Sequence, residues 1–178
     1  MPRDGAFRVS APPTGWVCDL MSGERLLLWA YRSWLEGLTA RQPTRHQEVW
    51  NGLSRQLGSE PARRLLGALS RLIYRCVREA QGEIAYHPNC CRQVAPDECR
   101  LLGLVAATGH HETALARNQA ARLLRGGSGD DLLSPAADIA RVLQEAGYDL
   151  PLRRTDDRSE AILRAVEALP TLDRSLPN

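Results

Sequence analysis

The chain has 178 residues, of which 43% are hydrophobic and 25% charged, and its formal net charge is +2. This composition is typical of one globular domain that folds without a metal or a disulfide, and the charge argues against nucleic acid or an anionic membrane as the main partner. All 23 basic side chains are arginine. The absence of lysine excludes a Schiff-base or P-loop lysine, and codon bias in a GC-rich, bacterial genome explains it most simply.

The N-terminal segment and the apolar runs bear on where the protein works. Residues 1–15 contain no apolar stretch of signal-peptide length and include Asp4. The longest strongly apolar runs, 26–31 and 101–107, are far too short to span a bilayer. We therefore expect a cytoplasmic protein with no membrane partner and with reduced thiols. Five cysteines, an odd number, also fit poorly with a complete disulfide framework.

Helical periodicity dominates the chain, and the alternation typical of strands is nearly absent. The sequence predicts an all-α fold, a single-domain bundle of about seven helices with a flexible N-terminal arm over residues 1–21. Ser22 and Ser59 are placed to cap the first and third helices, and Pro96 is placed to open the fourth. The expected helices cover residues 23–38, 44–57, 60–81, 96–108, 112–125, 134–147 and 159–170.

The glycine-rich segment 126–131 is the best candidate for a break between subdomains. It separates a helical core over 22–125 from a C-terminal helical pair over 132–170, which we expect to pack on the core; residues 171–178 form a tail. Ser134 and Pro135 are expected to open the first helix of that pair, which puts Asp138 in its first turn.

The connection at 83–95 and the helix after it carry the most distinctive pattern. His87, Cys90, Cys91 and Cys99 lie within 13 residues. They are donors of the kinds that zinc prefers, and the His-x-x-Cys spacing is short enough to chelate. Adjacent side chains tend to diverge, so either Cys90 or Cys91 can be a bystander. The first hypothesis is therefore a structural zinc site made by these four residues, with zinc as the one candidate cofactor.

Two alternatives to zinc stay open for this cluster. Cys99 lies in the first turn of a predicted helix, where the helix dipole favours the thiolate, so Cys90 or Cys91 could pair with it in a thiol-based redox sensor. The cysteines could equally be packing residues of a loop that crosses the core. Cys76 lies among apolar residues of the third helix and is expected in the core, whereas Cys18 has no discernible partner.

An arginine stripe on the third predicted helix suggests a partner surface. Its members share one face, opposite the apolar face, and are Arg64, Arg71, Arg75 and Arg78. The stripe could meet phosphates or an acidic protein surface, or it could simply be solvated. We expect another protein as the partner, with nucleic acid as the weaker alternative because the net charge is small.

Trp29 is the second surface feature. It points away from the core stripe of the first helix, beside Arg25, Arg32 and Glu36. A tryptophan on a charged face either packs beneath a covering segment or anchors a partner. We therefore take Trp29 as a candidate partner-binding residue.

No complete catalytic signature is present. Glu24, Glu98 and Asp138 fall in the first turns of predicted helices, where carboxylates favour the helix dipole. A nucleophilic pair of Cys99 and His87 would lack an identifiable orienting residue. We therefore favour a regulatory or adaptor module, stabilised by zinc, over an enzyme. The alternatives are a thiol redox sensor and a nucleic-acid-binding regulator that uses the arginine stripe.

Overall fold

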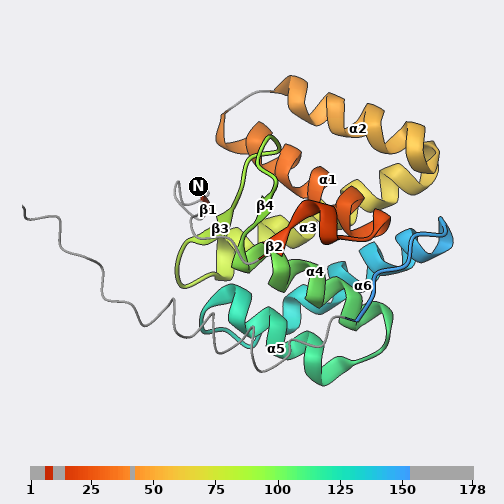
Figure 1. The fold of residues 1–178 in the computed structure, drawn as a ribbon. Coiled ribbons are helices and arrows are strands. Elements are labelled where there is room, and N and C mark those ends of the chain that lie inside the picture. Colours follow the sequence, from red (N-terminus) through yellow and green to blue (C-terminus); the bar gives the residue numbers. More distant parts are fainter. Residues whose placement is uncertain (1–6, 10–14, 41–42, 153–178) are drawn as a thin grey trace, which may run out of the picture.

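The computed structural model describes residues 7–9, 15–40 and 43–152, and this part of the chain is mostly helical (Figure 1). It confirms the all-α fold, with six α-helices where the sequence predicts about seven for the whole chain. The expected helix at 159–170 and the tail at 171–178 lie outside the described residues. The helices are α1 (Ser22–Thr39), α2 (Pro43–Leu57), α3 (Ser59–Glu79), α4 (Pro96–Gly109), α5 (Thr113–Leu124) and α6 (Asp130–Glu145), preceded by a short 3-10 helix (Val17–Asp19).

The helices surround one core in which α3 is central. α3 packs against α2 on one side and α6 on the other, while α4 packs against α5 and α6 (Figure 1). Leucines dominate the buried residues, and α3 alone buries Leu65, Leu69 and Leu72. Every helix whose side chains are described contributes to this cluster, so no described segment forms a separate core. No helix in the described ranges is both long enough and apolar enough to cross a bilayer.

Short strands tie the N-terminal residues to the connection between α3 and α4. β1 (Phe7–Val9) pairs in parallel with β3 (Ile84–Tyr86), and β2 (Gly15–Trp16) pairs antiparallel with β4 (Gln93–Val94). The sequence predicts a flexible arm here, whereas its described segments are hydrogen-bonded to the body of the protein. Strands of two or three residues are too short to show alternation, which explains why the sequence pattern misses them.

The segment between α5 and α6, where the sequence suggests a subdomain break, forms a tight corner. Arg125 and Gly129 both have positive φ, 56° and 68°, and a Cβ added at Gly129 would lie 2.5 Å from the Cβ of Ala120. Glycine is therefore required by both backbone conformation and close approach. α6 begins immediately afterwards, at Asp130, and packs on α3 and α4 as part of the same core.

The predicted start of this helix at Ser134 is wrong by four residues. Pro135 lies inside α6 and is buried. Proline lacks an N–H, so it leaves one helical hydrogen bond unmade, but the helix still gains Asp130 and Asp131 in a first turn that favours acidic side chains. Asp138 consequently lies in the middle of α6 and not in its first turn.

Candidate functional site

The connection that carries the cysteines is held by one buried arginine of α1. Arg32 is only 2% exposed, and its guanidinium donates two hydrogen bonds of 2.7 Å to the two carboxylate oxygens of Glu98 on α4. The same guanidinium donates to the backbone carbonyls of Cys91 at 2.8 Å and Gln93 at 2.6 Å. The fork geometry of arginine makes this simultaneous grip on a carboxylate and two carbonyls feasible. Arg32 therefore fixes the connection against α1.

The two first-turn carboxylates of α4 complete this network. Glu98 also accepts the backbone N–H groups of His87 at 3.0 Å and Ala95 at 2.7 Å. Asp97 accepts the N–H of Ala85 at 2.7 Å and forms salt bridges with Arg100 and Arg125. The sequence predicts only a helix-dipole role for Glu98, and this is incomplete because the carboxylate neutralises a buried cation. Its partner is 66 residues away, beyond any local pattern.

Two further residues of α1, Ser33 and Glu36, form hydrogen bonds with the turn at the centre of the connection. Glu36 accepts the backbone N–H of Asn89 at 2.7 Å, and the Asn89 side chain donates to the Ser33 hydroxyl at 2.6 Å. The N–H of Cys91 closes the turn on the carbonyl of Pro88 at 2.9 Å. Cys90 and Cys91 thus lie on a turn that hydrogen bonds from other parts of the protein hold.

The structure does not gather the predicted zinc ligands into a site. His87 is buried, Cys90 and Cys99 are exposed, and Cys91 is half-buried. Within the described ranges, no group of three or more histidine, cysteine, aspartate or glutamate side chains is placed to hold a metal ion. A tetrahedral zinc site needs donors that converge on one point, and this arrangement does not supply them.

His87 and Cys76 both lie in the interior. Burial lowers the pKa of His87 below its ordinary value of 6.5, and its Nε2 atom has no hydrogen-bond partner. Burial raises the pKa of the Cys76 thiol to about 12, and the side chain packs in the core. The core assignment of Cys76 is therefore confirmed. Cys18 is exposed, and its thiol lies 3.7 Å from the carboxylate of Asp19.

The arginine stripe of α3 faces a matching row of carboxylates on α6. The salt bridges join Arg64 to Glu145 at 2.6 Å, Arg71 to Asp138 at 2.8 Å, and Arg75 to Asp131 at 3.0 Å. The two helices run antiparallel, and the seven-residue interval from Arg64 to Arg71 on α3 matches the interval from Asp138 to Glu145 on α6, about two helical turns in each case. The fourth member, Arg78, lies over the exposed ring of Tyr74, 5.7 Å from its centre. Three of the four stripe residues are thus neutralised within the fold.

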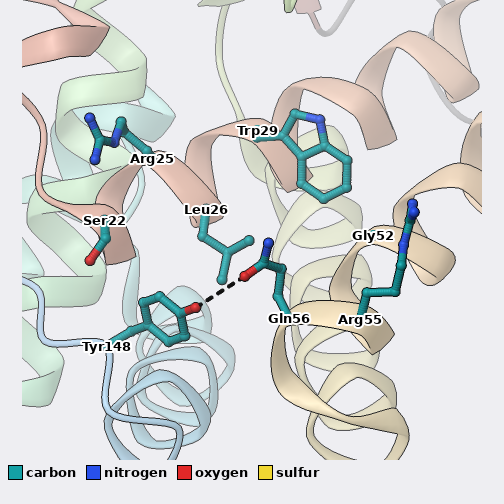
Figure 2. A pocket seen from close by; sticks show the side chains of 8 residues that line it. All are labelled: Ser22, Arg25, Leu26, Trp29, Gly52, Arg55, Gln56 and Tyr148. Atoms are coloured by element: carbon teal, nitrogen blue, oxygen red, sulfur yellow. Dashed lines mark hydrogen bonds between the residues drawn. The ribbon is translucent and has the colours of Figure 1, made fainter.

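Trp29 lies in a notch between α1 and α2. A Cβ added at Gly52 would lie 2.3 Å from the Cη2 atom of the indole, so only glycine lets α2 approach the ring this closely. Beside the ring is a hollow of about 490 Å³, lined by two arginines and by apolar and uncharged polar side chains (Figure 2). The lining residues are Ser22, Arg25, Leu26, Trp29, Gly52, Arg55, Gln56 and Tyr148.

A second hollow, of about 260 Å³, adjoins the first and shares Arg25 and Trp29 with it. Its other lining residues come from α1, the 3-10 helix and the cysteine-bearing turn: Val17, Leu28, Arg32, Asn89, Cys91 and Arg92. We call the two hollows together the arginine groove. Among the described residues, no aspartate or glutamate lines either hollow.

The arginines of this groove differ from most others in their lack of ion pairs. Arg25, Arg55 and Arg92 are exposed and make no salt bridge with any described residue, although Arg55 donates through Nε to the carbonyl of Asn51 at 3.1 Å. Arg32 also reaches the groove, but Glu98 neutralises it. The groove therefore presents uncompensated positive charge around a tryptophan.

Comparisons with models of protein families, with curated proteins and with solved structures found no match. The site must therefore be interpreted from its own chemistry.

Sequence reasoning finds Trp29 and Arg25 in this groove but misses Arg55, Arg92 and Tyr148. Trp29 and Arg25 are four residues apart on one helix, so their shared face is visible from spacing. The other three come from α2, the cysteine-bearing turn and the segment after α6, and only tertiary packing brings them together. The sequence also places Arg32 beside Trp29 on a charged face, whereas the structure buries Arg32.

Proposed function

We propose that this protein is a small regulatory or adaptor module that binds an acidic segment of another protein through the arginine groove. The observation that carries the proposal is the gathering of Arg25, Arg55 and Arg92, none paired with a described carboxylate, around Trp29. Guanidinium groups recognise carboxylates through paired hydrogen bonds, and a tryptophan supplies the buried anchor typical of protein interfaces. We further propose that it acts in the cytoplasm.

A protein partner is favoured over nucleic acid by the distribution of charge. The stripe residues Arg64, Arg71 and Arg75, which would be the natural phosphate contacts, already pair with carboxylates of α6. Nucleic-acid binding depends on neutralising many phosphates, and a formal charge of +2 offers little long-range attraction. The groove instead combines a few cations with apolar surface, as protein interfaces do.

Binding of a fluorescein-labelled oligoglutamate peptide, followed by fluorescence anisotropy at low salt, tests the proposal. We expect binding that weakens as sodium chloride is added and that is lost in Arg25→Glu and Arg55→Glu. Arg78→Glu is the matched control, because it makes the same change in charge at an exposed arginine that lies outside the groove and forms no salt bridge with any described residue.

The results for these variants distinguish binding at the arginine groove from binding at the arginine stripe of α3. Equal loss in all three variants would mean that only net charge matters and would contradict the groove. Tighter binding to a labelled DNA duplex, lost in Arg78→Glu but retained in Arg25→Glu, would favour the nucleic-acid alternative. The absence of any binding to oligoglutamate at low salt would refute the proposal.

The thiol-switch hypothesis is a second candidate because Cys90 and Cys99 are exposed to oxidants. Peptide mapping after mild peroxide treatment should then show Cys99 linked to Cys90 or Cys91. Unreactive thiols would exclude it. The zinc hypothesis requires His87 and the cysteines to rearrange from their described positions. About one equivalent of metal in protein purified without chelators would support it.

A further inference from the structure

We infer that the acidic segment bound by the arginine groove carries an aromatic or large aliphatic side chain, which enters the hollow between α1, α2 and Tyr148. This inference rests on the proposed function and adds the chemical class of the ligand. It divides recognition into an apolar anchor within the hollow and carboxylates at its arginine-lined edges.

The walls of the hollow are suited to an apolar anchor. Leu26 and Trp29 line it from α1. Tyr148, which follows α6 in the sequence, lines it at the lower side of the view in Figure 2. The hydroxyl of Tyr148 donates to Oε1 of Gln56 at 3.3 Å, so the tyrosine ring is held in place by a residue of α2. A volume of about 490 Å³ lies within the usual range for ligand pockets, about 300–1,000 Å³. An apolar side chain placed here would contact Leu26, Trp29 and Tyr148.

The charged groups stand on opposite sides of this apolar surface. Arg25 lies on the α1 side and Arg55 on the α2 side, with Leu26 and Gln56 between them (Figure 2). Nε of Arg55 is taken by the carbonyl of Asn51, which leaves its two terminal amino groups to donate. A ligand with carboxylates on both sides of its anchor matches this arrangement.

A peptide fits this surface better than a small aromatic acid because a second hollow shares Arg25 and Trp29 with the anchor site. Arg25 and Trp29 form the boundary between the two hollows, and Arg92 and Cys91 line the far one. An extended chain advances about 3.3 Å per residue, so a few residues carry carboxylates beyond the anchor towards Arg92. A single small acid would occupy one hollow only.

Two synthetic peptides test the inference. Both have acetylated and amidated ends, and they place either phenylalanine or alanine between two pairs of glutamates. The readout is the indole N–H signal of Trp29 in a ¹⁵N-labelled full-length chain, assigned by its loss in Trp29→Phe. Because burial of a phenylalanine side chain stabilises a complex, the phenylalanine peptide should bind about tenfold or more tightly than the alanine peptide.

Blocking the hollow provides the variant test. Ser22→Trp places a large side chain at the wall of the hollow and should reduce binding of the phenylalanine peptide to the level of the alanine peptide. Ser59→Trp is the matched control, because Ser59 is likewise the exposed first residue of a helix but lies outside the groove. Circular dichroism checks that both variants remain folded.

The outcomes distinguish the inference from the proposal beneath it. Equal affinity for the two peptides, with binding still lost in Arg25→Glu, overturns the anchor and leaves the acidic-partner proposal standing. Unchanged selectivity in Ser22→Trp also overturns the anchor. Binding of free phenylpropionate as tightly as the phenylalanine peptide shows a small aromatic acid to be the ligand. Failure of both peptides to bind refutes the proposed function as well.

Discussion

Removal of the Arg32 guanidinium should destabilise the fold more than any exposed arginine substitution. The side chain is 2% exposed, and its partner Glu98 is fully buried. In Arg32→Met the unbranched apolar part of the side chain is kept, but Glu98 loses its counter-ion and the carbonyls of Cys91 and Gln93 lose their donor. Breaking a buried pair from one side costs about 3–5 kcal/mol, because a charge stays buried without compensation.

This loss is large in relation to a typical free energy of unfolding of about 5–15 kcal/mol. Urea denaturation at neutral pH, followed by circular dichroism, measures it. Arg63→Met is the control, since Arg63 pairs with Glu60 on the surface and is 72% exposed. The control should change the free energy of unfolding by less than about 1 kcal/mol. Equal effects of the two substitutions would refute a structural role for the buried network.

A double substitution tests the cause of the loss. Glu98→Gln alone should destabilise the protein, because it weakens the bonds to Arg32 and to the backbone N–H groups of His87 and Ala95. In the Arg32→Met background the same change removes an uncompensated charge. The double variant should therefore be more stable than Arg32→Met alone, and the coupling should be measurable in the cycle. Simple additivity would show that the two side chains act independently.

Three further predictions follow from individual side chains. Iodoacetamide at mildly alkaline pH should modify exposed Cys90 but not Cys76, whose pKa burial raises to about 12; comparable labelling of both in the folded protein contradicts this. Gly52→Ala should displace the indole of Trp29, at a cost of about 1–3 kcal/mol by urea denaturation, and an unmoved indole signal would oppose it. Burial lowers the pKa of His87 from 6.5, so the stability that neutral His87 contributes is complete above that pH and is lost as the pH falls towards the folded-state pKa. In His87→Gln, the free energy of unfolding measured in urea should therefore decline less steeply as the pH falls. An unchanged dependence of this free energy on pH would contradict the prediction.

Local patterns in the sequence are sufficient to predict the described helices, but they are insufficient to predict several of the residues at which these helices begin or end. The capping signals near Ser59 and Pro96 place α3 and α4 within a residue or two of their observed starts. The predicted start of α6 at Ser134 is wrong because proline is most common in the first turn of a helix, whereas here α6 begins at Asp130 and buries Leu132 before Pro135. Local patterns do not predict the paired strands, because their hydrogen bonds join segments about 80 residues apart, such as Phe7 and Ile84.

The turn that carries Cys90 and Cys91 is held partly by residues of α1, which are distant from it in the sequence. Arg32 and Glu98 hold that turn through its backbone, which no spacing of side-chain donors reveals. Proximity in sequence thus predicts a shared location but not convergence on one point.

In an arginine-only protein, the positions of the carboxylates decide which cations are available for binding. On α6, Asp131, Asp138 and Glu145 recur every seven residues, and this spacing matches Arg64 and Arg71 on antiparallel α3. Such complementary periodicity is visible in the sequence, so the pairing of the stripe could have been predicted from it. The groove lacks any such complement among its described lining residues. Charge reversal at Arg25 should therefore affect binding more than stability, whereas reversal at Arg71, which removes a salt bridge and opposes Asp138, should affect stability first.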